Sequence, residues 1–312
     1  MINNKEKNFI SAVVYVRNDE HTLAELLKKI NNAFSANFNK YEIICVNDAS
    51  DDNSIDVIKE FSKTQEVQKV SIINMSFYHG VELSMQAGVD LAIGDFVFEF
   101  DNQKNDFEED VIRSVYNKCL EGNDIVFAVP DKKRKCGLSK WYYRVFNKYS
   151  KSKYKLQPDT FRLLSRRAIN RVKDINKVIP YRKAVYCNCG LKVDSVEYKS
   201  VSQKMKKKQK PLKEKVGTAM DSLILFTKVG YKISFIMSMI MLLFTVGIAG
   251  YALVFYLQNL AVKGWTTTVL FLSFGFFGLF FMLSIAIKYL DVLIGLNFKN
   301  KYYLIRDIEK LN

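Results

Sequence analysis

Two long stretches without any charged residue, Ile233–Leu257 and Gly264–Ile287, place the strongest limit on what this chain can fold into. As an α-helix the first would be roughly 37 Å long at ~1.5 Å per residue, enough to cross the hydrocarbon core of a bilayer. A single cation, Lys263, lies between the stretches, and Lys288 closes the second. The pattern predicts a hairpin of two membrane-spanning helices. Two buried helices of a soluble domain are the competing interpretation, which such long charge-free stretches make the weaker one.

The cations that flank these stretches set the expected orientation, because positively charged flanks stay in the cytoplasm. They are Lys206, Lys207, Lys208, Lys210, Lys213 and Lys215 before the first stretch, and Lys288, Lys299, Lys301 and Arg306 at or after the end of the second. The apolar run Phe9–Val16 is too short for a signal peptide and continues directly into polar residues. We therefore expect a multi-pass protein of the cytoplasmic (inner) membrane, with both termini and the catalytic part in the cytoplasm.

The positive charge of the chain is concentrated in residues 131–215. The formal net charge is +15, and this segment alone holds 27 Lys and Arg against 6 Asp and Glu. A basic segment beside a membrane hairpin is attracted to anionic lipid headgroups. Nucleic acid is the competing partner, and we rank it below the membrane because the segment lacks the interleaved aromatic residues of a base-stacking surface. We expect a membrane and no nucleic acid as partner.

Apolar runs and helical patterns alternate along the first hundred residues. Runs at 10–16, 43–46, 70–73 and 96–100 are separated by helical patterns at 23–30, 55–61 and 80–92. This alternation predicts a mostly parallel α/β sheet, which binds ligands beyond the carboxyl ends of its strands. The residues that follow the first, second and fourth runs are polar and mostly acidic: Arg17, Asn18, Asp19 and Glu20, then Asn47 and Asp48, then Asp101, Asn102 and Gln103. Such an edge suits a nucleotide bound through a divalent cation and through hydrogen bonds to ribose and base.

Motifs that the sequence lacks narrow the chemistry further. Neither GxGxxG nor GxxxxGK[ST] is present, so the usual glycine-rich phosphate loops of dinucleotide and P-loop enzymes are missing. The five cysteines form no CxxC pair, which argues against a disulfide framework and against a closed zinc site. The two histidines, His21 and His79, are too far apart in the sequence to suggest a metal site or a catalytic triad.

An ordered set of segments resembles the family 2 glycosyltransferases of the GT-A fold. It consists of Val14–Glu20, Val46–Ser54, and Ala87-Gly88 through Gly94-Asp95 to Asp101. In the C-terminal half, Phe161–Arg167 resembles the family's FRL segment, and Pro211–Phe226 followed by the two apolar stretches resembles the linker and hairpin of polyprenyl-phosphate glycosyltransferases, the group that includes dolichyl-phosphate mannose synthase. The resemblance covers nearly the whole chain. It implies a GT-A domain at 1–203, a basic linker or amphipathic helix at 204–231, two transmembrane helices at 232–290 and a cytoplasmic tail at 291–312.

The resemblance also implies roles for individual residues. The nucleotide sugar would be held by Val16, Asn18, Asp19, Glu20, Asp48, Asp51, Gly80 and Gln103. Mg²⁺ or Mn²⁺ would be bound by Asp101 and Gln103, which align with the family's Asp-Xaa-Asp. Asp101, Asp159 and Arg162 would be catalytic, and the acceptor phosphate would be bound by Arg162, Arg166, Arg167 and Lys204. For Asp48 and Asp51 the competing role is that of a helix cap.

The function that the resemblance implies is an inverting transfer of a sugar from a UDP- or GDP-linked donor to a polyprenyl phosphate such as undecaprenyl phosphate. Two departures from the family pattern keep an alternative open: Gln103 replaces the second Asp of Asp-Xaa-Asp, and Thr160 stands where the family has Asp before Phe. The alternative is a catalytically weakened relative that acts as a membrane-anchored binding or assembly subunit in a polysaccharide pathway. The oligomeric state, a homo-oligomer included, stays open.

Overall fold

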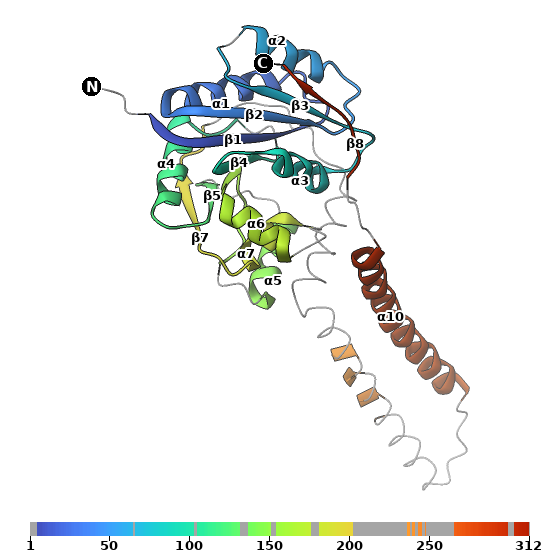
Figure 1. The fold of residues 1–312 in the computed structure, drawn as a ribbon. Helices are drawn as coiled ribbons and strands as arrows, with labels where there is room; N and C mark the ends of the chain where they lie inside the picture. The colour runs from blue at the N-terminus through green and yellow to red at the C-terminus, as the bar shows by residue number, and fades with distance from the viewer. Residues whose placement is uncertain are drawn as a thin grey trace, which may run out of the picture.

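The computed structural model describes residues 5–64, 66–102, 105–131, 137–150, 154–175, 181–201, 265–298 and 303–311, together with 236–237, 239–240, 243–244 and 247. Within these ranges lie an α/β domain and one long helix that extends away from it (Figure 1). Lys204, Gln103 and most of the first apolar stretch lie outside the described residues.

Eight strands of the described residues form one sheet in the order β7-β5-β6-β4-β1-β2-β3-β8. Their bounds are β1 Glu6–Val16, β2 Phe38–Asn47, β3 Val70–Met75, β4 Phe96–Phe100, β5 Ile125–Pro130, β6 Phe161–Ser165, β7 Val193–Tyr198 and β8 Ile305–Lys310. The inner strands are buried along almost their full length, as expected for Val- and Ile-rich strands covered on both faces. This confirms the predicted α/β class.

The strand directions bring the candidate site residues to one edge of the sheet. β1 pairs in parallel with β2 and β4, and β2 pairs in parallel with β3, so the carboxyl ends of these four strands meet at the same edge. β6 runs antiparallel to β4, with Glu99 opposite Arg162. As a result the first residues of β6 lie at that edge, and the residues that follow β6 lie at the opposite one.

Helices cover both faces of the sheet. Their bounds are α1 Leu23–Asn37, α2 Ser54–Thr64, α3 Val81–Leu91, α4 Glu109–Leu120, α5 Gly137–Tyr149, α6 Arg166–Ile175 and α7 Arg182–Asn188. α1, α2 and α4 contribute to one apolar core, and α3, α5, α6 and α7 to the core on the other face. Side chains of β1 alternate between the two cores: Val14 belongs to the first and Val13 to the second. The domain is therefore a three-layer α/β/α arrangement.

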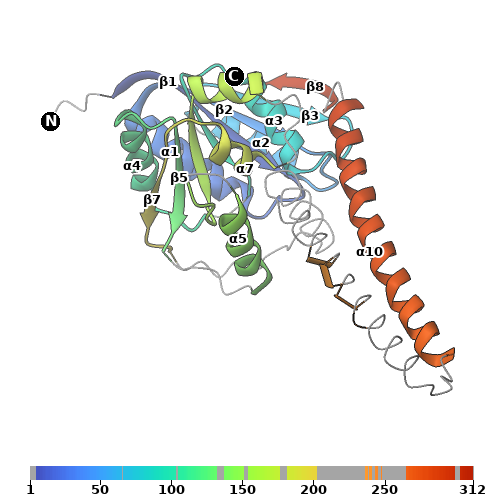
Figure 2. The same ribbon diagram turned by 90° about the horizontal axis from the view of Figure 1, so that it is seen from below.

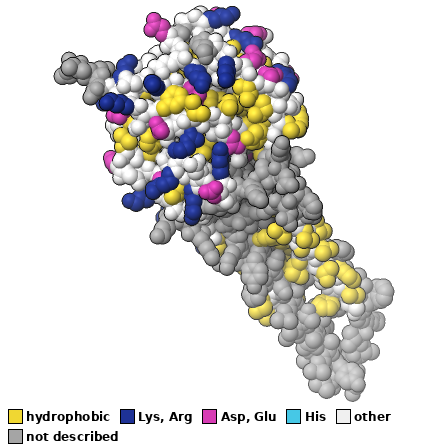
Figure 3. Space-filling view, viewed as in Figure 1, with side chains coloured by type: hydrophobic (Ala, Val, Ile, Leu, Met, Phe, Trp, Pro, Cys, Tyr) yellow, Lys and Arg dark blue, Asp and Glu magenta, His cyan; other side chains and the backbone are white. Residues whose placement is uncertain are grey.

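α10 Trp265–Phe298 follows at the C-terminal end of the chain and projects from the domain in both ribbon views (Figure 2). Several of its leucine and phenylalanine side chains are exposed, Phe276 and Leu290 at 56% each. Figure 3 shows hydrophobic side chains gathered along this projecting part, whereas the α/β domain carries interspersed charges. The structure describes only some of the side chains of α10. Within the described residues, no helix is long and apolar enough to cross a membrane.

The C-terminal residues return to the sheet. Sequence analysis assigns 291–312 to a separate tail, but α10 continues to Phe298 and β8 pairs antiparallel with β3, from Ser71 opposite Lys310 to Met75 opposite Ile305. β8 was not anticipated, because its pattern IRDIEK alternates polar and apolar residues over one short segment and its partner lies more than 200 residues away. The α/β domain therefore includes the end of the chain.

Candidate active site

The loops that follow β1 and β2 are joined to each other by side chain to backbone hydrogen bonds. Asn18 Oδ1 accepts from the Asp51 amide at 2.7 Å, and Glu20 Oε2 accepts from the Asn53 amide at 3.0 Å. In return, Asp52 Oδ2 accepts from the Glu20 amide at 3.1 Å. Asn18 has φ 52°, in the left-handed region that non-glycine residues rarely adopt. These reciprocal bonds hold both loops in one conformation at the carboxyl edge of the sheet.

Asp48, predicted to bind the nucleotide, is completely buried. Its Oδ2 accepts from the Tyr15 hydroxyl at 2.9 Å and from the Gly80 amide at 2.9 Å, and its Oδ1 accepts from the His79 amide at 2.8 Å. Burial and the adjacent Asp48 carboxylate raise the pKa of Tyr15, so its hydroxyl stays protonated and donates to Asp48. Asp48 thus ties the turn between β3 and α3 to the end of β2, and its burial distinguishes it from the solvent-exposed helix cap that is the competing role.

The turn between β3 and α3 carries aromatic side chains that sequence analysis did not single out. Phe77 is 55% exposed and Tyr78 is 45% exposed, and the Arg17 guanidinium lies 4.8 Å from the centre of the Tyr78 ring. Exposed aromatic and guanidinium faces of this kind can stack on a planar heterocycle. The pattern SFYHG directly after a buried strand was the available signal. Together with the two joined loops, this turn forms one half of the candidate site.

The other half is a cluster of charged side chains where β4 ends and β6 begins. Arg162 is 2% exposed and forms ion pairs with Glu99, Asp101 and Asp159. Arg182 and Lys183, from α7, complete the cluster: Arg182 pairs with Glu99 at 2.6 Å, and Lys183 pairs with Asp159. The structure therefore brings together the three residues predicted to be catalytic, Asp101, Asp159 and Arg162.

Sequence analysis missed Glu99, Arg182 and Lys183. Glu99 is fully buried and accepts a hydrogen bond from the Tyr186 hydroxyl at 2.7 Å. The signal was a single Glu inside the apolar run FVFEF, because an acidic residue in a buried strand requires a partner. Arg182 and Lys183 lie on a helix of 7 residues without an apolar repeat long enough to predict it.

Ion pairing sets the protonation of this cluster. Burial favours neutral Asp101, but the Arg162 guanidinium and the Asn102 amide outweigh it and lower the pKa of Asp101. Burial likewise disfavours the charged form of Lys183, and Asp159 outweighs it, so that the pKa of Lys183 is raised. Lys183 and Asp101 therefore carry full charges at neutral pH.

Of the predicted metal-binding pair Asp101 and Gln103, the structure describes only Asp101, and both carboxylate oxygens of Asp101 have partners. Asp101 Oδ2 is ion-paired with Arg162, and Asp101 Oδ1 accepts from the Asn102 side chain at 2.6 Å. Asp106 Oδ1 is occupied by the hydroxyls of Tyr198 and Thr160, at 2.9 and 3.2 Å. Across the part of the chain that the structure describes, no group of three or more His, Cys, Asp and Glu could hold a metal. Gln103 lies outside that part.

The structure separates Arg166 and Arg167 from Arg162, with which they were predicted to share a phosphate site. The reason is the antiparallel direction of β6, which places the residues after it at the opposite edge of the sheet. Arg166 donates there to the carbonyls of Ala92 and Gly94, and Arg167 forms a bidentate pair with Asp124, both bonds at 2.7 Å. A single phosphate site with Arg162 is therefore not formed by these residues, and Lys204 lies outside the described residues.

The remaining predicted residues lie in or beside the joined loops. Val16 is buried at the end of β1, Asp19 Oδ2 accepts from the Arg17 amide at 3.1 Å, and Asp51 is exposed with its carboxylate 3.5 Å from Arg17. Gly80 precedes α3 with φ 83°, a backbone conformation that requires glycine. All of them lie at the same edge as Asp48.

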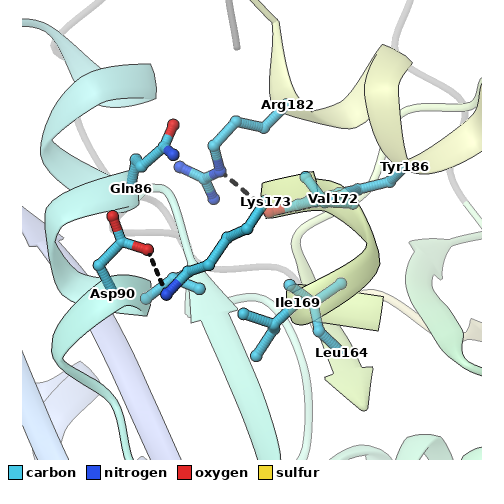
Figure 4. Close-up of a pocket in the computed structure, with 9 residues that line it drawn as sticks. Gln86, Asp90, Leu164, Ile169, Val172, Lys173, Arg182 and Tyr186 are labelled. Carbon is cyan, nitrogen blue, oxygen red and sulfur yellow. Dashed lines mark hydrogen bonds and ion pairs between the residues drawn. The ribbon is translucent and has the colours of Figure 1, made fainter. Parts of the chain in front are cut away.

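A hollow lies behind the charged cluster, between α3, α6 and α7 (Figure 4). Its volume, open solvent included, is about 280 Å³, and Arg182 and Tyr186 line the side toward Glu99. Across its mouth Lys173 pairs with Asp90 at 2.7 Å. The hollow is mostly apolar, and one polar atom of its lining, Gln86 Oε1, is buried without a hydrogen-bond or ion-pair partner among the described residues. We assign the hollow to packing between the helices, because its other lining side chains come mainly from α3 and α6.

Comparison with known proteins adds an independent finding. The model of the family described as "Glycosyl transferase family 2" matches residues 11–186. An uncharacterised glycosyltransferase of Bacillus subtilis, YkcC, is 27% identical over 70% of this chain and 68% of its own length. A prophage bactoprenol glucosyl transferase homologue of Escherichia coli is 29% identical over 61% of this chain and 62% of its own length.

Among solved structures, the mannosyltransferase PcManGT of Pyrobaculum calidifontis, in complex with GDP-Man and Mn²⁺, has a TM-score of 0.50. The alignment covers 91% of this chain and 88% of that one at 12% identity, and therefore concerns the fold.

Proposed function

Because the chain belongs to glycosyl transferase family 2 and has a GT-A-like α/β fold, we propose that it transfers a sugar from a nucleotide sugar to a polyprenyl phosphate at the cytoplasmic face of a membrane. The observation that carries the lipid part of this proposal is the exposed apolar surface of α10, which is joined through β8 to the sheet that holds the candidate site. Large exposed apolar surfaces are stable in water only when lipid or protein covers them. The two charge-free stretches of the sequence support the same conclusion.

Two further observations support the choice of substrates. The joined loops after β1 and β2, with Phe77 and Tyr78 beside them, offer amide groups, carboxylates and aromatic faces to a nucleoside. The E. coli relative is described as a bactoprenol glucosyl transferase homologue. A similar protein of Shigella phage SfV is described as a bactoprenol glucosyl transferase.

The proposed reaction is a single displacement. A phosphate oxygen of the lipid attacks the anomeric carbon and forms the new C–O bond, while the bond from that carbon to the diphosphate breaks and the nucleoside diphosphate leaves with both electrons. The anomeric configuration is inverted. A phosphate monoester has a second pKa of about 6, so the attacking oxygen is mostly deprotonated at neutral pH and needs positioning more than a general base.

In this mechanism the charged cluster orients the reacting groups. Arg162 is paired with Asp101, whose side chain is 27% exposed and is the most accessible carboxylate of the cluster. Lys183 keeps Asp159 paired beside it. Asp101 and Gln103 are the residues that would hold Mg²⁺ or Mn²⁺, and such an ion would neutralise charge on the leaving diphosphate. The transfer assay therefore compares Mg²⁺, Mn²⁺ and EDTA.

The test is a transfer assay with the full chain in detergent micelles or nanodiscs. A panel of UDP- and GDP-linked sugars is incubated with polyprenyl phosphate in Mg²⁺, Mn²⁺ or EDTA, and lipid-linked sugar is extracted and quantified. We expect transfer from at least one donor, and a loss of at least a hundredfold in Asp101→Asn, with the exposed Asp110→Asn as the matched control. Absence of lipid-linked product with every donor would refute the proposal.

One observation favours a second candidate, a family relative that binds but no longer transfers. Asp101 is already paired with Arg162, and Gln103 replaces the second acidic residue of the family motif. Such a protein would act as a membrane-anchored binding or assembly subunit. Calorimetry separates the two candidates: nucleotide-sugar binding without transfer supports the subunit, whereas transfer that is abolished by Asp101→Asn excludes it.

A further inference from the structure

The C-terminal segment Tyr303–Lys310, called here the C-terminal strap, contacts more than the edge of the sheet. Beyond the pairing of β8 with β3, the carbonyl of Leu304 accepts a hydrogen bond from the Ser76 amide at 2.9 Å. The strap therefore follows the chain past the end of β3 and into the turn that leads to α3. The Tyr303 hydroxyl donates to Asp90, near the other end of α3, at 2.7 Å. The strap thus contacts the turn that precedes α3 and the C-terminal end of α3.

His79 is the point at which the strap reaches the turn. The Leu304 amide donates to His79 Nε2 at 3.0 Å. On the other side of the ring, His79 Nδ1 lies 2.5 Å from the Phe77 carbonyl, and the ring stacks on Phe77 with a centroid distance of 4.1 Å. A carbonyl only accepts, so Nδ1 carries the hydrogen and Nε2 offers the lone pair that Leu304 uses. Every hydrogen-bonding atom of the ring is therefore committed to one orientation.

The backbone of His79 holds the donor half of the candidate site. The amides of His79 and Gly80 donate to the two carboxylate oxygens of Asp48, which is completely buried at the end of β2. The exposed rings of Phe77 and Tyr78 lie in the same turn. A single run of contacts thus leads from Leu304 through the His79 ring and backbone to Asp48. Leu304 therefore holds this turn at two points, through its amide to His79 Nε2 and through its carbonyl to the Ser76 amide.

We propose that Leu304 and His79 are positioning residues for the nucleotide sugar: the C-terminal strap fixes the turn Ser76–Gly80 and thereby the donor pocket. The inference rests on the proposed function in that it takes this edge to be the donor site. The strap follows α10 in the sequence and contacts the turn Ser76–Gly80. The proposed lipid-facing helix and the proposed nucleotide-binding turn are therefore linked through the strap.

Two substitutions of one residue test the proposal in the full chain. His79→Leu removes the acceptor for the Leu304 amide, whereas His79→Gln keeps an oxygen acceptor at a similar distance from the backbone. We expect KM for the nucleotide sugar to rise about three- to tenfold in His79→Leu with kcat within about twofold of wild type, and to be largely restored in His79→Gln. This is the range expected for the net worth of one hydrogen bond.

Lys59→Gln is the matched control for a general loosening of the strap. Lys59 pairs with Glu309 at 2.8 Å, at the end of the strap far from His79. Its substitution should lower the melting temperature slightly and leave KM unchanged. An equal rise of KM in Lys59→Gln and His79→Leu, or no rescue by His79→Gln, would overturn the positioning role.

Amide hydrogen exchange separates this inference from the proposed function. In His79→Leu the amides of residues 76–80 should exchange at least threefold faster, while those of β1 and β2 stay unchanged. Hydrogen exchange is measured without substrate. If the wild-type protein transfers no sugar, the proposed function is refuted, but the exchange rates of residues 76–80 still test the contact between Leu304 and His79. Unchanged exchange in residues 76–80 would refute the inference even where transfer is observed.

Discussion

Glu99→Gln tests whether the buried charged cluster holds the domain together. Glu99 is completely buried in β4 and accepts from the Tyr186 hydroxyl at 2.7 Å, while its other oxygen faces Arg182 at 2.6 Å and Arg162 at 3.3 Å. Gln has nearly the same shape and still accepts from Tyr186. The substitution therefore removes one negative charge and leaves two buried guanidinium groups with fewer partners.

The magnitude follows from the burial of these groups. Breaking a buried ion pair by removing one partner costs about 3–5 kcal/mol, because the remaining charge stays in a medium of low dielectric. We take the lower end, about 3 kcal/mol, because Gln keeps the hydrogen bond to Tyr186 and Arg162 keeps Asp101 and Asp159. For a domain of this size, about 2–4 °C of melting temperature corresponds to 1 kcal/mol, so the expected decrease is about 6–12 °C.

The assay is thermal unfolding of the full chain in detergent at pH 7.5, with Glu60→Gln as the matched control. Glu60 is an exposed acidic residue on α2, and its substitution should shift the melting temperature by less than about 1 °C. A Glu99→Gln protein that melts within 1 °C of wild type would refute the reasoning, since it would mean that the charge of Glu99 contributes nothing in the folded state.

Three further predictions follow from other parts of the domain. Gly94→Ala should destabilise the protein by about 1–3 kcal/mol in the same melting assay, because the new Cβ would lie 2.7 Å from the Ser11 amide nitrogen. Gly190 has φ 78° but open space around it, and a larger decrease in melting temperature in Gly190→Ala than in Gly94→Ala would contradict this prediction. Burial alone would raise the pKa of Asp124, but the hydrogen bond and charge of Arg167 outweigh burial, and the net effect is a lowered pKa. The ionised Asp124 therefore stabilises the fold above its unfolded pKa of about 3.9, and this stabilisation is lost as the pH falls through the folded pKa. The difference in melting temperature between wild type and Asp124→Asn should therefore close below about pH 4, and a difference that persists to pH 2 would argue against it. Burial raises the pKa of the thiols of Cys45, Cys119, Cys187 and Cys189, to about 12 in the first three. A thiol reagent at pH 8 should therefore react quickly with at most one cysteine of the native protein and with all five after denaturation.

The central sheet could be predicted from the sequence because its signals are local. Each of the four parallel strands is a short apolar run, and each is followed by polar residues that the parallel direction brings to one edge. Asp48 and Asp101 were found in this way. Their contacts could not be predicted in the same way, since the partners of Asp48 come from the turn at His79 and Gly80, and the partner of Asp101 comes from β6.

Strand direction and distant pairing account for what the sequence did not reveal. Arg162, Arg166 and Arg167 are close in the sequence, but β6 lies between them and carries the last two to the opposite edge. A short strand inside a mixed sheet, such as β6, carries no local signal of its direction. β8 is a stronger example, because nothing in 305–310 indicates that its partner is β3, more than 200 residues earlier.

The charges of the cluster also limit how it can receive a diphosphate. Three cations of the described residues, Arg162, Arg182 and Lys183, already face the carboxylates of Glu99, Asp101 and Asp159, so the cluster as folded offers no surplus positive charge. An incoming anion must therefore exchange with one of these carboxylates. Glu99 and Asp159 have side chains that are 0% and 6% exposed, whereas that of Asp101 is 27% exposed. Asp101 is the partner that can be displaced at the lowest cost, since water already reaches it and can solvate the released carboxylate. Of the three carboxylates in the cluster, Asp101 is therefore the one that solvent reaches most easily.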